Sequence, residues 1–118
     1  MGDFCQENKR IAIIIDKSLT KGQAANVAAI LMGQVSVSSD FIYDNRPLID
    51  QSGVFHCAIK NNIIVLKAGP YNLKNLWKET KATISFIFTE EGTMFSDDFD
   101  AYRKFILSNK IDTLRAVG

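Results

Sequence analysis

The feature that most constrains this chain is an uninterrupted apolar run, Ile11 to Ile15, that ends at Asp16. The run is rich in β-branched side chains and carries no polar residue on either face, which is typical of a strand covered on both sides. After a short polar loop, an alanine-rich segment from Gly22 to about Val35 has the pattern of a helix that packs closely on its neighbours. A buried strand followed by such a helix predicts an α/β fold with this strand in the middle of a sheet.

The bulk composition fits one globular domain over residues 1–118. Hydrophobic residues make up 47% and charged residues 23%, which is enough apolar material for a core. With a formal net charge of +1, the chain has no overall attraction for DNA or for an acidic membrane surface, so any anion site must be local. The first ten residues are polar and no apolar segment approaches the roughly 20 residues of a membrane span, so the cytoplasm is the expected location.

The rest of the chain alternates between strand and helix patterns. Strands are predicted at 54–59, 63–66 and 83–89, and helices at 72–81 and 96–109. The first two strands flank Asn61-Asn62, which predicts an antiparallel pair, with one long bent strand as the alternative. Residues 111–117 either begin a last strand or trail. This order predicts a three-layer α/β/α sandwich with a mixed sheet of four to five strands.

A ligand site is expected beyond the carboxyl end of the first strand, where open α/β sheets bind ligands. Asp16, Lys17 and Lys21 lie in the loop there, which leads into the amino end of a helix and so attracts anions. The loop is neither a phosphate-binding P-loop nor a dinucleotide fingerprint, so a well-capped surface loop is an equally good interpretation. Asn26 stands inside an otherwise apolar helix and needs hydrogen-bond partners, either by pinning the loop or by pointing into the site.

The segment from Asp50 to Cys57 holds the single histidine, His56. In a strand His56 and Cys57 face opposite sides, so they do not form a nucleophile–base pair with one another. A Ser-His-Asp triad through His56 stays open, although no GxSxG elbow is present. The alternative is a structural hydrogen bond. One histidine and two cysteines, with no CxxC, predict no metal site, no disulfide framework and no cofactor.

Two charged clusters have simpler explanations. Lys74, Lys78 and Lys81 could form a basic face for RNA, but a charged outer face is what most amphipathic helices show. The aspartates between 97 and 100 could mimic a metal cluster, but acids at a helix start are explained by its dipole.

Several short motifs, taken in order, resemble a family. The residues that carry the resemblance are Ile11 to Asp16, Leu19, Lys21-Gly22, Ala24 to Ala29, Leu48, Asp50, Gly53, His56 and Ile63 to Ala68. The opening strand and helix resemble those of peptidyl-tRNA hydrolase type II, and the longer pattern is similar to uncharacterised small bacterial proteins with that fold. The resemblance spans about residues 10–88. The hydrolases have glutamine and histidine along the first helix, where this chain has Asn26 and Ala29, so the resemblance implies the fold more than the activity.

The resemblance and the loop together imply a site made of six residues gathered near the first strand's carboxyl end: Asp16, Lys17, Lys21, Asn26, Asp50 and His56. The leading hypothesis is a binding or accessory domain for a small anionic ligand or tRNA. The second is an esterase that acts on aminoacyl- or peptidyl-tRNA, in which Lys21 neutralises phosphate and Asp16 or Asp50 positions water. The third is a homodimeric structural module without catalysis.

Overall fold

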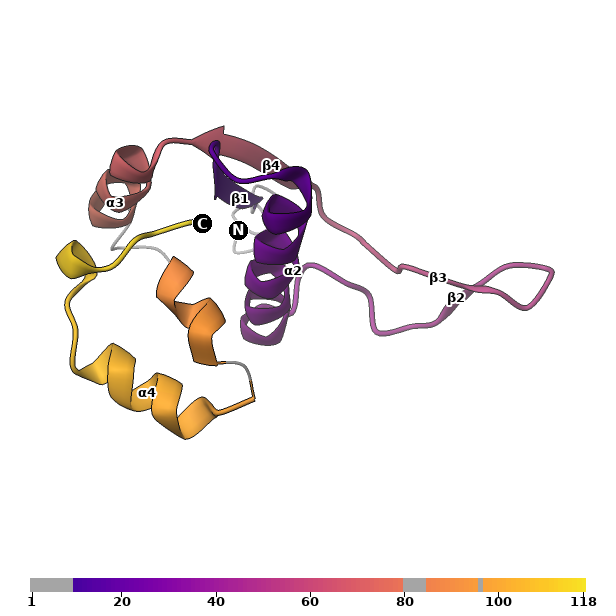
Figure 1. Cartoon of the computed structure of the whole chain (residues 1–118). Helices are drawn as coiled ribbons and strands as arrows, with labels where there is room; N and C mark the ends of the chain where they lie inside the picture. The colour runs from indigo at the N-terminus through magenta and orange to yellow at the C-terminus, as the bar shows by residue number, and fades with distance from the viewer. Residues whose placement is uncertain (1–9, 80–84, 96) are drawn as a thin grey trace, which may run out of the picture.

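Two short β-sheets and three α-helices organise the described part of the chain, which comprises residues 10–79, 85–95 and 97–118 of this computed structural model. Figure 1 shows the elements in order. They are β1 (Ile11–Asp16), α2 (Lys21–Ser38), β2 (Leu48–Ile49), β3 (Phe55–His56), β4 (Ile63–Ala68), α3 (Pro70–Glu79) and α4 (Phe99–Leu107), with 3-10 turns at Glu90–Phe95 and Ile111–Thr113. The fold is mixed α/β, as the sequence predicts.

Strand β1 confirms the strand predicted at Ile11–Asp16 and contributes to the core, but it does not confirm the prediction that both of its faces are covered. It pairs in parallel with β4, so that Ile11 lies opposite Ile63 and Asp16 lies opposite Ala68. The side chains of Ile11, Ile13 and Ile15 are buried in one cluster with residues of α2. Ala12, on the other face of β1, is exposed, so the strand is fully covered on the α2 side alone.

Helix α2 begins where the sequence predicts, because its first turn is closed by a reciprocal cap. The Thr20 hydroxyl accepts the N–H of Gln23 at 3.3 Å, and the Gln23 side chain accepts the N–H of Thr20 at 3.0 Å. Such a capping box satisfies two of the helix's orphan donors at once. Val27 and Leu31 are the buried residues that attach the helix to the β1 sheet.

The last residues of the chain lie beside β1 as an extra extended segment. The Asp16 N–H donates to the Val117 carbonyl at 2.9 Å, and the Val117 N–H donates to the Phe88 carbonyl at 3.0 Å. An antiparallel bridge joins Thr89 and Ala116. The C-terminal segment 115–118 therefore runs between β1 and residues 88–90, where Ala116 and Val117 are buried.

The predicted antiparallel pairing of 54–59 with 63–66 is wrong. The apolar run of β4 pairs with β1, while β3 pairs back on β2 in a short antiparallel hairpin, Leu48 opposite His56. The reason is local: the Asp50–Gly53 turn closes residues 48–56 on themselves, and β4 is left to join the larger sheet. Within the described residues each sheet has two strands, so a three-layer sandwich with four to five strands is not confirmed.

The later elements differ in their bounds from the prediction. Residues 83–84 of the predicted strand, and Ser96, lie outside the described residues; 85–88 are extended without a strand assignment, and Thr89 forms a single bridge. The predicted helix at 96–109 begins at Phe99, because Asp98 caps it by accepting the Ala101 N–H at 3.1 Å. Asp97, just before the cap, has φ of 66°, a left-handed backbone that a helix cannot include.

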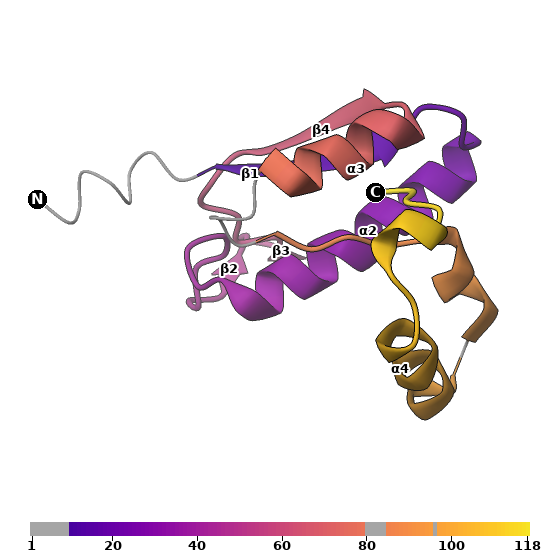
Figure 2. The ribbon, with the colours of Figure 1, turned by 90° about the vertical axis from the view of Figure 1, so that its left-hand side faces the viewer.

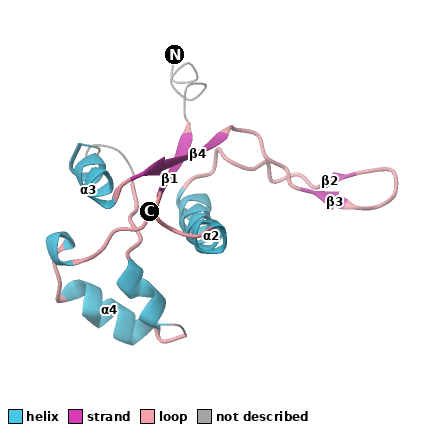
Figure 3. Ribbon diagram, turned by 45° about the horizontal axis from the view of Figure 1, so that its top comes forward, coloured by secondary structure: helices cyan, strands magenta, loops and turns pink. Residues whose placement is uncertain are grey.

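The β2–β3 hairpin projects from the body as an arm, seen in Figures 1 and 3. We call residues 45–57, all exposed, the hairpin arm. The arm contributes to a radius of gyration of 16.5 Å, against about 13.5 Å for a compact chain of this length. Apolar side chains on it are half-exposed or more: Leu48 (53%), Ile49 (50%), Val54 (54%) and Phe55 (72%).

None of the helices in the described ranges combines the length and apolar character that a membrane crossing requires.

Candidate functional site

A buried carboxylate with a half-exposed arginine marks the carboxyl end of β1. Asp16 is 1% exposed, and its Oδ1 accepts the Ser18 N–H and the Ser18 hydroxyl, both at 3.0 Å. Its Oδ2 accepts a hydrogen bond from Arg115 Nη2 at 3.2 Å. We call Asp16, Ser18 and Arg115 the Asp16 cluster. Buried charges are tolerated when they are paired and hydrogen-bonded in this way.

The Asp16 cluster keeps its carboxylate ionised. Burial by itself raises the pKa of Asp16, but the hydrogen bonds from Ser18 and Arg115, with the positive charge of Arg115, outweigh burial and hold that pKa below its ordinary value. Asp16 therefore carries a full negative charge at neutral pH and holds the guanidinium in place.

Several acceptors hold Arg115, yet its side chain remains 47% exposed. Its Nη2 lies 3.3 Å from the Ser18 hydroxyl, and its Nε lies 3.6 Å from a carboxylate oxygen of Glu90. Its backbone N–H donates to the Glu91 carboxylate at 3.1 Å. The guanidinium is therefore held in position by neighbouring acceptors while about half of the side chain is exposed.

Three of the predicted site residues lie on the loop after β1 or on α2, and within the described part of the chain none of their side chains is hydrogen-bonded or ion-paired to this cluster. Lys17 follows Asp16 and is exposed, with its N–H bonded to the Ala68 carbonyl at 2.9 Å. Lys21 is the first residue of α2 and is also exposed. Asn26 lies on an exposed position of α2, where water can satisfy its amide, so it does not need to pin the loop.

Asp50 and His56 lie on the hairpin arm, which precedes β4 in the chain. The first residue of β4, Ile63, pairs with Ile11 of β1, whereas Asp16 is in the last pair of the same two strands. The structure thus separates the six predicted residues into two groups. Asp50 Oδ2 and His56 Nε2 are 2.7 Å apart, and this hydrogen bond is the main cause that lowers the pKa of Asp50.

The Asp50–His56 pair has a clear structural role. Asp50 Oδ1 also accepts the N–H groups of Ser52 at 2.8 Å and Val54 at 3.1 Å. The carboxylate therefore holds both the turn and the opposite strand of the arm, with Gly53 supplying a φ of 84°. This arrangement fits the structural hydrogen bond that the sequence left open for His56.

Sequence reasoning missed Arg115 and Ser18. Arg115 stands 99 positions from Asp16 in a segment with no motif, and no local pattern points to it. The one available signal was Asp16 itself, since a carboxylate at the end of a buried strand requires donors. Ser18 follows two residues later, at the spacing of an Asx turn.

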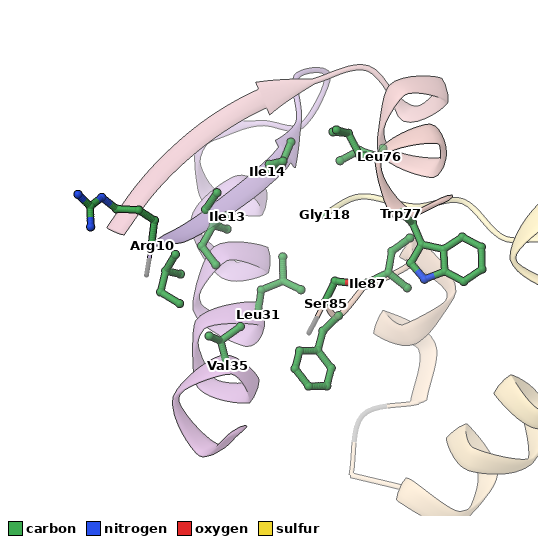
Figure 4. A pocket seen from close by; sticks show the side chains of 14 residues that line it. Arg10, Ile13, Ile14, Leu31, Val35, Leu76, Trp77, Ser85, Ile87 and Gly118 are labelled. Carbon is green, nitrogen blue, oxygen red and sulfur yellow. The ribbon is translucent and has the colours of Figure 1, made fainter. Parts of the chain in front are cut away.

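Two cavities lie away from the Asp16 cluster. One, of about 290 Å³, lies among β1, α2, α3 and residues 85–87 (Figure 4). The other, of about 440 Å³, is bounded mainly by aromatic and aliphatic side chains of α3 and α4, together with Ile87, Ile111 and Leu114. Thr89 lines the second cavity, and its buried hydroxyl has no hydrogen-bond partner among the described residues.

Within the described ranges, no three His, Cys, Asp or Glu side chains lie close enough together to hold a metal ion. Cys57 is an exposed free thiol on the hairpin arm.

Comparison with known proteins places the chain among proteins of unknown function. The comparison with curated proteins finds no match. A solved structure of the protein of unknown function Atu0240 from Agrobacterium tumefaciens strain C58 is similar, with a TM-score of 0.80 and 22% identity. The similarity covers 92% of this chain and 81% of that one, and at this identity it shows the fold alone. The model of the family described as "Protein of unknown function (DUF2000)" matches residues 9–118, and this chain therefore belongs to that family.

Proposed function

We propose that this domain binds a small ligand through one phosphate or carboxylate group, at the carboxyl end of β1. The observation that carries the proposal is the geometry of Arg115, a half-exposed guanidinium held from behind by a buried carboxylate. Guanidinium groups bind planar anions through paired N–H donors, and an arginine that is already oriented loses less freedom on binding.

The surroundings favour a single anionic group over a polyanion. Ser18 and Lys17 add a hydroxyl and an ammonium group on the loop that leads to the amino end of α2, which itself favours negative charge. The Glu90 carboxylate lies 3.6 Å from Arg115 Nε, and the Glu91 carboxylate accepts the Arg115 backbone N–H; both repel further negative charge. Because tRNA binding depends on many phosphate contacts, this balance supports a small ligand over tRNA.

A fold like that of peptidyl-tRNA hydrolase type II, which the sequence resembles, is compatible with this proposal. The parallel pairing of β1 with β4 and the direct connection from β1 into α2 support it. The proposed ligand site uses Asp16, Lys17 and Lys21 from the predicted set and adds Ser18 and Arg115. Asn26, Asp50 and His56 are not required by it.

The test is isothermal titration of the folded protein with inorganic phosphate, phosphate monoesters and monocarboxylates. Lys17→Gln removes one cation without touching the Asp16 cluster, and Arg115→Gln removes the central one. Each should weaken the best anion, Arg115→Gln by about tenfold or more, since hydrogen bonds to charged groups contribute about 1.5–3 kcal/mol. Lys78→Gln, an exposed cation in the last turn of α3, is the control of equal charge change and should bind as wild type.

The same titration, repeated with tRNA and accompanied by an assay of peptidyl-tRNA hydrolysis, separates the alternatives. Equal loss in the Lys78→Gln control would mean general charge screening and would reject the site. Binding of tRNA without binding of any small anion, or release of peptide from peptidyl-tRNA above a heat-killed control, would favour the hydrolase hypothesis in its place.

A further inference from the structure

We infer that the cavity of about 440 Å³ beside α4, called the α4 cavity below, binds an apolar monocarboxylate of about ten carbon atoms, such as a medium-chain fatty acid. All the residues that line this cavity lie within the described ranges. Neither Arg115 nor Lys17 is among them, so the inference goes beyond the proposed function and does not depend on it.

One face of helix α4 forms a wall of the α4 cavity. The five lining residues of this helix are spaced at i, i+3, i+4, i+7 and i+8, which places them on one face: Phe99, Tyr102, Arg103, Ile106 and Leu107. None of the residues of α4, all of which are described, is buried, and Phe99 is 71% and Leu107 67% exposed. The helix lies apart from the β1–β4 sheet, at the margin of the molecule (Figures 1 and 2). Its apolar face therefore borders the cavity and solvent instead of a packed core.

The other side of the cavity is also apolar. It is made of Trp77 of α3, Ile87, Ile111 and Leu114, of which Leu114 is buried. If one water-sized group occupies about 30 Å³, the cavity admits roughly 12–15 non-hydrogen atoms, which is the size of a carboxylic acid with about ten carbon atoms. Such a chain would cover apolar surface on both sides of the cavity at once, and the hydrophobic effect favours this arrangement.

The charge of the lining residues selects the head group of the ligand. Arg103 is exposed and lines the cavity, and none of the described residues around it is an aspartate or a glutamate that also lines the cavity. Within the described part of the chain, the Arg103 guanidinium is not engaged in an ion pair. A guanidinium binds a carboxylate through paired, charge-assisted hydrogen bonds. Charge complementarity therefore favours an anionic head at Arg103, with the apolar tail between the two sides of the cavity.

Two hydroxyl groups favour an occupant that carries oxygen atoms over a pure hydrocarbon. Thr89 is 3% exposed, and its hydroxyl has no hydrogen-bond partner among the described residues. Tyr102 lies nearby: the Gly92 N–H donates to the Thr89 carbonyl at 3.0 Å, and a Cβ on Gly92 would lie 3.0 Å from the Tyr102 hydroxyl. Burial raises the pKa of Tyr102, so this hydroxyl stays protonated and can donate. A buried hydroxyl without a partner costs free energy, which a carboxylate oxygen can recover.

The experiment titrates the intact chain with decanoate. Trp77 is the single tryptophan and lines the α4 cavity, so its fluorescence should change saturably as decanoate binds. Decanol keeps the tail but loses the charge and should bind several-fold more weakly. Decylamine carries the charge that Arg103 repels and should bind more weakly still, while acetate, which lacks the tail, should leave the fluorescence unchanged.

Two pairs of variants tie binding to the α4 cavity. Arg103→Gln should weaken decanoate at least fivefold and leave decanol unchanged, while Lys104→Gln, the next residue of α4, exposed and outside the lining, should bind as wild type. Ile106→Phe narrows the cavity and should weaken both compounds at least tenfold, while Val37→Phe, at an exposed position of α2, should not. Trp77 also borders the smaller cavity, but Ile106 does not, so this variant assigns the fluorescence change. Circular dichroism checks that all four variants are folded.

Several results would overturn the inference. These are the absence of a saturable fluorescence change, equal loss in Lys104→Gln, and full binding to Ile106→Phe. Loss of decanoate binding in Lys17→Gln but not in Arg103→Gln would assign the carboxylate to the anion site of the proposed function instead. Dimerisation in light scattering that decanoate does not affect and that Leu107→Ser abolishes would assign this face of α4 to a second copy of the chain.

Discussion

Replacing Arg115 by glutamine should destabilise the fold more than the exposure of this side chain suggests. The substitution leaves the Asp16 carboxylate enclosed without its cation, and removing one partner of a buried pair costs about 3–5 kcal/mol in other proteins. Here Ser18 still donates two hydrogen bonds, and the half-exposed position of Arg115 admits water, so we expect a smaller cost, about 2–3 kcal/mol. For a domain of this size that corresponds to a decrease in melting temperature of roughly 8–12 °C.

A second substitution separates the ion pair from simple packing. Asp16→Asn keeps the shape and the Oδ1 acceptor for Ser18 but removes the charge, and the exposed Arg115 can return to water. We expect a cost of about 1–2 kcal/mol. The double variant buries no charge at all, so it should be more stable than the sum of the single effects by about 1.5–2 kcal/mol, the coupling that a double-mutant cycle measures.

The measurement is urea unfolding at pH 7, followed by the fluorescence of Trp77 and by circular dichroism. The pKa of Asp16 in the folded protein lies below its ordinary value of 3.8. The ionised Asp16 therefore contributes its full stabilisation of the fold above pH 3.8, and this contribution is lost as the pH falls through the folded pKa. The difference between wild type and Arg115→Gln should therefore shrink below about pH 4. A cost under about 0.5 kcal/mol for Arg115→Gln at pH 7, with additive behaviour of the double variant, would refute the claim that Asp16 fixes this guanidinium.

Three further predictions concern other parts of the chain. Gly92→Ala should destabilise by about 1–3 kcal/mol in urea unfolding, because its Cβ would lie 2.8 Å from the ring of Phe88. The matched change Gly33→Ala, in α2 with nothing within 4 Å of the new Cβ, should stabilise by about 0.5–1 kcal/mol, and loss of stability there would contradict the packing argument. The exposed apolar hairpin arm predicts a homodimer, which light scattering should detect and Phe55→Ser should weaken; a strict monomer at high concentration contradicts it. His56→Ala should speed hydrogen exchange within the arm without moving the midpoint of global unfolding, because its hydrogen bond lies wholly in the exposed hairpin, and a lowered midpoint would contradict that.

The parts of the fold that local chemistry decides could be predicted from the sequence. The run of β-branched residues in β1 favours a strand. Thr20 and Gln23 form a capping box that fixes the start of α2. The sequence predicts the start of α4 three residues early, at Ser96, whereas the helix begins at Phe99 and Asp98 is its cap. At the start of each of these two helices the capping contacts lie within three residues of one another.

Strand pairing could not be predicted in the same way. Residues 54–59 and 63–66 are close in sequence, so pairing them with each other closes the shortest loop and loses the least chain entropy. The structure instead pairs Ile63 with Ile11, 52 positions away, in a parallel register of six residue pairs, although most of β4 remains exposed. The intervening residues then close on themselves through Asp50, whose carboxylate serves a turn rather than a shared site.

The candidate site shows the same limit in its polar residues. A carboxylate at the end of a buried strand needs donors, but nothing in the sequence indicates which of the 14 basic side chains supplies one. The basic residues nearest to Asp16 in the sequence, Lys17 and Lys21, are exposed, and neither of them pairs with its buried carboxylate in the described structure. Arg115 reaches Asp16 because the C-terminal segment docks beside β1 through the bond from the Asp16 N–H to the Val117 carbonyl. Docking of that segment and assembly of the proposed anion site are therefore one event, and a substitution that loosens the segment should weaken anion binding even where it touches no residue of the Asp16 cluster.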